Sequence, residues 1–102
     1  MEEIKAYGLK EGKLEIELCG EIHSGNADEF YKTVVEAYKQ TPVSVVFDGK
    51  QLDFIDSTAL GAFVKILKTV KTDGNTLGFK NLQAKIKKLF VICSLDTIME
   101  IA

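Results

Sequence analysis

The sequence predicts one α/β domain with a mixed sheet of four to five strands, helices packed mainly on one face, and an N-terminal β-hairpin. Two observations carry this prediction. First, segments of alternating polarity are interspersed with segments of helical periodicity, in the order β-β-α-β-α-β-α with one possible final element. Second, the spacing and polarity of the strands define the sheet. Strands separated by helices of this length require crossovers and parallel pairing. Residues 13–18 have one polar face, so helices are expected to cover mainly the other side of the sheet.

The N-terminal hairpin is predicted from an alternating strand and the glycine that precedes it. Leu14, Ile16 and Leu18 alternate with charged residues, which is the period-two pattern of a strand with one buried face. Gly12 indicates a turn that joins this strand to a shorter one over residues 4–9.

A first helix is predicted from about residue 27 up to Pro42, which cannot continue a helix. Asn26 is a suitable N-cap, Glu29 stands where a side chain can reach back to the cap, and Asp28 adds negative charge to the first turn. The residues on its inward face are Ala27, Phe30, Val34, Ala37 and Tyr38.

A central strand and a second helix follow. Residues 43–47 are β-branched and nearly all apolar, as expected of a strand near the middle of a sheet. Asp48 and Gly49 predict a turn directly after them. The second helix is expected over residues 57–73, with Gly74 as its terminating residue.

The C-terminal part predicts a strand over residues 76–79 and a third helix from about Gln83. Residues 97–101 are expected to close the chain with a strand or a helical turn. The residues on the inward stripe of the third helix are Ile86, Leu89, Phe90 and Cys93.

Composition narrows the class of protein. The 102 residues, 46% of them hydrophobic, suit one globular domain over the whole chain. A formal net charge of −2 argues against nucleic acid and against a membrane surface as partners, and the lysines at 85, 87 and 88 are interpreted as a solvated helix face. Cys19 and Cys93 are too far apart for a disulfide scaffold or a zinc motif. No segment resembles a secretory signal or a membrane span, so we expect a cytoplasmic protein.

The segment Asp-Ser-Thr-Ala-Leu-Gly at residues 56–61 is the most informative in the chain. It places the hydroxyls of Ser57 and Thr58 at the start of a helix, where unpaired N–H groups and the helix dipole favour an oxygen or a phosphate. A seryl group in this setting is suited to modification or to recognition by a partner. The alternative is that Asp56 or Ser57 simply caps the helix.

Three other chemistries fit the residues less well. A hydrolase that uses Ser57 and the single histidine, His23, would lack the Gly-x-Ser-x-Gly elbow. A phosphoaspartate receiver domain centred on Asp48 would lack the acidic pair that follows its first strand. A metal site formed by Asp48, Asp53 and Asp56 is not needed, because turn and capping roles explain each aspartate. We therefore predict no catalytic residue, no metal and no cofactor.

Four short segments form a pattern in a fixed order. They are Cys-Gly-Glu-Ile at 19–22, Val-Val-Phe-Asp at 45–48 with Leu-Asp-Phe at 52–54, Phe-Ile-Asp-Ser-Thr-Ala-Leu-Gly at 54–61, and Ile-Lys-Lys-Leu-Phe at 86–90. Together they resemble the STAS domain family, in particular the single-domain anti-sigma factor antagonists of bacteria. Members of that family carry Gly-Glu-Leu, Asp-Ser-Ser/Thr-Gly-Leu-Gly and Val-Lys-Arg-Leu-Phe at corresponding places. The resemblance covers essentially the whole chain and implies a STAS-type fold.

The resemblance implies a partner switch. An unmodified antagonist binds an anti-sigma factor that is also a serine kinase of the Bergerat ATPase type, and a sigma factor is released. The kinase then phosphorylates the first hydroxyl residue after the signature aspartate, which is Ser57 here, and binding is lost until a serine phosphatase resets the cycle. The alternative is a STAS scaffold without phosphorylation, such as a subunit of a larger signalling assembly or of a transporter ATPase complex.

The partner surface is expected to combine the loop after the second strand with the start of the second helix, because both should emerge at the same end of the sheet. Its residues would be Glu21, His23, Ser24, Asp56, Ser57, Thr58 and Lys65. The hydroxyl of Thr58, one residue further into the helix, is expected to satisfy backbone groups. Two residues depart from the family pattern: Ala59 replaces a glycine, which a helix tolerates, and His23 replaces an acid that is thought to lie near the phosphorylated serine.

Overall fold

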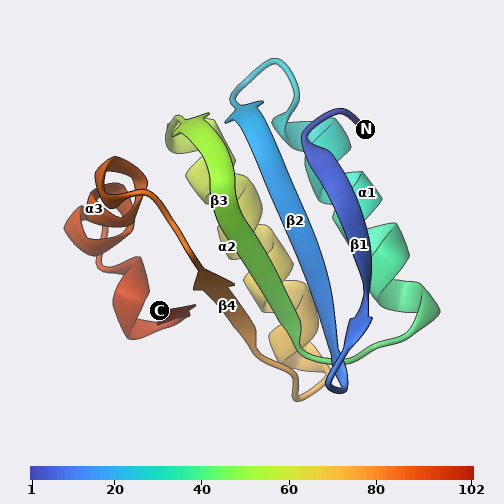
Figure 1. Cartoon of the computed structure of the whole chain (residues 1–102). Helices are drawn as coiled ribbons and strands as arrows, with labels where there is room; N and C mark the ends of the chain where they lie inside the picture. Colours follow the sequence, from blue (N-terminus) through green and yellow to red (C-terminus); the bar gives the residue numbers. More distant parts are fainter.

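The computed structural model describes residues 1–102 and contains one five-stranded mixed sheet in the order β1-β2-β3-β4-β5 (Figure 1). The elements are β1 (Ile4–Lys10), β2 (Lys13–Ile22), α1 (Ala27–Gln40), β3 (Val45–Ile55), α2 (Ser57–Thr72), β4 (Leu77–Lys80), α3 (Ala84–Ile92), the 3-10 helix η1 (Leu95–Thr97) and β5 (Glu100–Ile101). β1 pairs with β2 antiparallel, and the other three pairs are parallel. The predicted α/β class and the N-terminal hairpin are confirmed. The predicted final element is present as both a 3-10 turn and a strand.

The hairpin turn consists of Glu11 and Gly12, whose φ angles are 53° and 80°. Two consecutive residues with positive φ belong to the tight turn whose twist matches that of paired strands, and glycine is the residue that adopts this conformation without strain. Gly12 thus supplies the turn that the sequence predicted.

Figure 1 shows α1 and α2 side by side against one face of the sheet, with α3 beyond the end of β4 and next to the upper part of β3. Their apolar stripes and the inward side chains of the strands form one core of 24 buried residues, and no polar residue is buried. The ring of Phe63 lies at its centre, 5.0 Å from the ring of Phe79 and 5.4 Å from that of Phe47, both in edge-to-face arrangements that favour aromatic pairs. The opposite face of the sheet carries charged residues, including Glu15 and Lys80, which form an ion pair of 2.7 Å.

The turn predicted at Asp48 and Gly49 is wrong, because β3 runs through both residues. β3 is hydrogen-bonded on both sides, to β2 and to β4, and this pairing outweighs the local turn preference. The Asp48 carboxylate instead accepts a hydrogen bond from the Lys50 N–H at 3.0 Å. Gly49 is buried, and a Cβ there would displace the end of the Leu82 side chain, so this glycine serves close packing rather than a turn.

The third helix is shorter than predicted. Cys93 is its C-cap and is exposed, so its predicted place on the inward stripe is wrong. Leu89 is also 36% exposed, and only Ile86 and Phe90 anchor α3 in the core. Cys93 lies past the last turn because α3 ends at residue 92, where the chain turns into η1.

A hydrogen-bonded cluster joins the C-terminal ends of α1 and α2. The hydroxyl of Tyr38 donates to the Asp73 carboxylate at 2.7 Å and accepts from the side-chain amide of Asn75 at 2.8 Å. Burial raises the pKa of Tyr38 above its ordinary value. Gly74, with φ 80°, ends α2 in the left-handed conformation, as predicted. None of the three helices has the length and apolar character needed to cross a membrane.

Candidate functional site

Two loops meet at the carboxyl edge of the parallel strands. Ile22 at the end of β2 pairs with Ile55 at the end of β3, so the chain leaves both strands at the same edge and enters α1 and α2 there. The expected meeting of the loop after β2 with the start of α2 is therefore present.

Asp56 connects the two loops. One carboxylate oxygen accepts the N–H of Ala59 at 2.9 Å, which makes Asp56 the N-cap of α2. The other oxygen accepts the N–H of Ser24 at 3.0 Å, from the loop 32 residues earlier. Asp56 is thus both a cap and a tether, and it fixes Ser24 beside the start of the helix.

The ionised form of Asp56 is favoured by these contacts. The hydrogen bond from the Ala59 backbone lowers the pKa of Asp56 most, and those from Ser24 and Thr58 and the charge of His23 act in the same direction. Desolvation opposes them but does not reverse the shift. The start of α2 therefore carries a fixed negative charge beside Ser57.

The loop over residues 23–26 is held by its own hydrogen bonds. The Asn26 side chain accepts the N–H of His23 at 2.9 Å and donates to the carbonyl of Glu21 at 2.9 Å. The predicted capping role of the Asn26 side chain is wrong, because its oxygen and nitrogen are both used inside the loop. The Gly25 N–H donates to Nδ1 of His23 at 3.0 Å, and a Cβ on Gly25 would approach the imidazole to 2.9 Å. His23 is therefore folded against the loop and is half-buried.

Ser57 and Thr58 are both exposed, at the first and second positions of α2. Neither hydroxyl forms a hydrogen bond within the chain, so the expectation that the Thr58 hydroxyl satisfies backbone groups is wrong. The capping function belongs to Asp56 alone. Both hydroxyls are thus free for a partner, and Ser57 lies closest to the unpaired N–H groups of the helix start.

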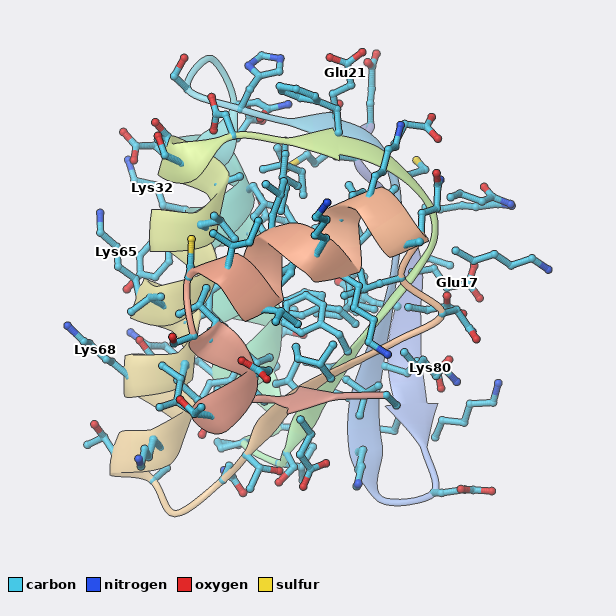
Figure 2. All side chains as sticks on the ribbon, turned by 90° about the vertical axis from the view of Figure 1, so that its left-hand side faces the viewer. Glu17, Glu21, Lys32, Lys65, Lys68 and Lys80 are labelled. Carbon is cyan, nitrogen blue, oxygen red and sulfur yellow. The ribbon has the colours of Figure 1, made fainter.

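The outer surface of α2 is basic, and a lysine of α1 lies on the same side of the molecule (Figure 2). Lys65 of α2 lies over the ring of Tyr31 of α1, with 5.8 Å between Nζ and the ring centre, which is within the range of a cation–π contact. Figure 2 shows Lys32, Lys65 and Lys68 projecting from the same side of the molecule, while Glu21 lies at the upper edge. Because α2 contains lysines and no acidic residue, its solvent face has a uniform sign.

Phe54 is an exposed apolar residue at this edge that the sequence analysis did not include in the site. It is 48% exposed, and it pairs with Glu21 across β2 and β3 at the same edge. The register of β2 against β3 shifts twice, between residues 17 and 19 and between residues 20 and 21. These shifts leave Asp53 and Phe54 both outside the core, which strict alternation does not predict.

The three aspartates considered for a metal site have separate partners. Asp48 accepts from the Lys50 N–H, Asp53 accepts from the Gln83 side chain at 3.1 Å, and Asp56 caps α2. No group of three metal-binding side chains comes together in the structure.

Comparison with known proteins identifies the family. A sequence profile of the STAS domain matches residues 6–102. An anti-sigma-B factor antagonist of Bacillus subtilis is 30% identical over 92 residues, which cover 90% of this chain and 84% of the relative. The crystal structure of a candidate anti-sigma factor antagonist from Thermotoga maritima superposes with a TM-score of 0.87 at 23% identity, over 94% of this chain and 83% of that protein. Bacillus SpoIIAA, in its phosphorylated form, superposes with a TM-score of 0.66 at 17% identity, over 95% and 91% of the two chains. The chain therefore belongs to the STAS domain family and, within it, to the anti-sigma factor antagonists.

Proposed function

We propose that this domain is an anti-sigma factor antagonist controlled by phosphorylation of Ser57. In the unphosphorylated state it binds an anti-sigma factor that is also a serine kinase of the Bergerat ATPase type, so that a sigma factor is released. Phosphorylation by this kinase ends the interaction, and a serine phosphatase restores it. The domain itself has no catalytic role in this cycle. We assign the cycle to the cytoplasm.

The exposed hydroxyl of Ser57, at the N-terminus of α2 and without a partner in the chain, is the observation that carries the proposal. A kinase can reach this hydroxyl without unfolding the helix. The phosphate would meet the positive end of the helix dipole, which favours it. The Bacillus relative SpoIIAA has been solved in a phosphorylated form, which supports the same cycle for a protein of this fold.

The partner surface of the proposal is continuous around this hydroxyl. Asp56 tethers Ser24 to the helix start, which keeps the loop and α2 in one fixed arrangement. Lys65 extends the surface along α2. The residues assigned to it are Glu21, His23, Ser24, Asp56, Ser57, Thr58 and Lys65.

Incubation with the anti-sigma factor kinase of the same organism and ATP tests the proposal, with intact mass as the readout. We expect one added phosphate in the wild type and in Thr58→Ala, and none in Ser57→Ala. Thr58→Ala is the matched control because its hydroxyl is equally exposed, one residue away. Equal labelling of Ser57→Ala would refute the assignment, and tight binding without any phosphate transfer would favour the STAS scaffold.

A further inference from the structure

The strand β1 leaves one edge of the sheet open. It pairs with β2 on one side and has no strand on the other, and Figure 1 shows it as the outermost strand. The strand at the opposite edge, β5, has only two residues, whereas β1 has seven. An edge strand presents unpaired backbone N–H and C=O groups, which another strand can use for pairing.

The outward-facing backbone groups belong to Tyr7 and Leu9. In an antiparallel pair of strands, opposite residues alternate between those that exchange hydrogen bonds and those that do not. Leu14 lies opposite Leu9 and donates its N–H to the carbonyl of Ser44 at 2.9 Å, on the β3 side, so Leu9 and Leu14 do not exchange hydrogen bonds. Alternation gives the same result for Tyr7 and Ile16, two residues along. The N–H and C=O groups of Tyr7 and Leu9 therefore point away from the sheet.

The side chains of the same two residues form an exposed apolar pair. They lie opposite Ile16 and Leu14, so they point to the face of the sheet that the helices cover. Ile16 and Leu14 are 1% and 4% exposed, whereas Tyr7 and Leu9 are 54% and 60% exposed. The helix layer therefore covers β2 and leaves this part of β1 open.

We infer that β1 pairs antiparallel with β1 of a second copy of this chain, about a two-fold axis through Gly8. In this register Tyr7 lies opposite Leu9 of the second copy, and the outward groups of the pair exchange hydrogen bonds in both directions. The symmetry repeats the pair on the other side of the axis. The exposed apolar side chains of the two copies then cover one another, and the two sheets become continuous.

The neighbouring registers fit less well. Opposite side chains share a face, so the axis of a symmetric pair of strands must pass through a residue. An axis through Tyr7 would place Leu9 opposite Lys5, where the register of β1 against β2 shifts. An axis through Leu9 would place Tyr7 opposite Glu11, which lies in the hairpin turn with a φ of 53°. The axis through Gly8 avoids both irregular residues.

The polar face of the sheet supplies a charge match in the same register. A hollow over Ala6 and Gly8 is bordered by Glu15 and Glu17, and Glu17 takes part in no ion pair of the chain. Lys10 of the second copy would lie opposite Ala6, and Glu17 is the residue of β2 on the other side of Ala6. Because the alanine side chain is small, the lysine can extend over it to Glu17. This match favours a second copy over an unrelated extended segment.

The dimer is expected to be weak. One strand from each copy falls well short of the roughly 20–30 residues a side of a standard interface, so we expect a dissociation constant on the order of 100 µM. The contact uses no residue of the Ser57 site, so its test is independent of the phosphorylation test.

Disulfide trapping tests the register. On the axis, the Cα atoms of Gly8 in the two copies would be about 4.5 Å apart, which is within disulfide range. A Cβ on Gly8 meets no atom within 4 Å, so Gly8→Cys should fold. In a Cys19→Ser, Cys93→Ser background, mild oxidation should link two copies of Gly8→Cys. Ala6→Cys is the matched control: the residue is also exposed, but its two copies would lie roughly 14 Å apart and should not be linked.

Sedimentation under reducing conditions tests the backbone pairing. From about 10 µM to about 1 mM the wild type should pass from monomer to dimer. Leu9→Pro removes an outward N–H and no hydrogen bond to β2, so it should fold and stay monomeric. Leu9→Ala keeps the N–H and should weaken the dimer by about 10-fold. Ile92→Ala removes a similarly exposed apolar side chain from α3 and should leave the dimer unchanged.

Three results would overturn the inference. They are a wild type that stays monomeric at about 1 mM, equal disulfide formation at positions 6 and 8, and an equal loss of the dimer in Ile92→Ala and Leu9→Ala.

Discussion

Phosphorylation of Ser57 is expected to weaken partner binding by on the order of 150-fold while leaving the stability of the domain nearly unchanged. The two effects have different origins. In the free domain the phosphate adds about −1.5 to −2 charges at an exposed helix start, where the dipole favours it by only ~0.3–1 kcal/mol. The neighbouring Asp56 carboxylate repels the phosphate, but this repulsion acts near the surface and is screened by salt.

The same group has a larger effect in the complex. A partner surface that fits a neutral hydroxyl must desolvate the phosphate or face its charge, and this costs several kcal/mol. About 3 kcal/mol corresponds to the 150-fold loss given above. Ser57→Asp should reproduce only part of this loss, since it adds one charge and a smaller head group. The switch would therefore act by local repulsion and desolvation, and the fold would not change.

Two measurements on the same samples separate these effects. Urea unfolding of phosphorylated and unmodified protein gives the free energy of unfolding, and calorimetric titration with the kinase gives the affinity. Amide NMR shifts should change only around residues 21–26 and 56–60. Shift changes through the core segment 45–47, or undiminished binding of the phosphorylated form, would show that the reasoning is wrong.

Three further changes follow from the geometry. Tyr38→Phe removes two hydrogen bonds between the ends of α1 and α2. The free energy of unfolding should therefore fall by about 1–2 kcal/mol, which lowers the melting temperature by roughly 4–10 °C. An unchanged melting temperature would mean that water replaces the hydroxyl. The lowered pKa of Asp56 stabilises the fold above the ordinary carboxyl value of 3.8, and this contribution disappears as the pH falls through the folded-state pKa. Urea midpoints of the wild type and Asp56→Asn, which caps equally well, should therefore converge on acidification, and a constant difference would contradict this. Gly25→Ala should displace the His23 imidazole and break its hydrogen bond, changing the NMR signals of that ring and loop with little effect on the melting temperature.

The sequence predicts the order of helices and strands well because hydrophobic periodicity is a local property. The apolar residues that show this periodicity are the ones that become buried in the core. The stripe of Phe30, Val34 and Tyr38 is an example, since each of the three is fully buried. The turn at Asp48-Gly49 fails for the opposite reason: both residues prefer turns locally, but two neighbouring strands impose an extended backbone on them. Tertiary pairing of this kind leaves no mark in a single sequence.

The sequence predicts that the loop after β2 meets the start of α2, but it does not predict the hydrogen bonds that join them. Asp56 was expected as a cap, and it is one. Its second hydrogen bond, to Ser24, joins residues 32 positions apart and depends on the register of β2 against β3. Asn26 satisfies the sequence rule for a helix cap, yet its side chain binds within the loop, because the loop offers both a donor and an acceptor.

The order of the strands in the sheet has a consequence for how the chain folds. Each strand pairs with the strand that precedes it in the sequence, so the order in space is the order of synthesis. No strand has to insert between two that are already paired, and each one adds to an edge that the growing chain has just formed. Each parallel pairing therefore closes a single crossover and joins residues 22 to 33 positions apart, from Gly78–Glu100 to Ile22–Ile55, and no pairing has to join the two ends of the chain. The hairpin of β1 and β2 can form first, and the rest of the domain can assemble on it from the N-terminus to the C-terminus while the ribosome is still extending the chain.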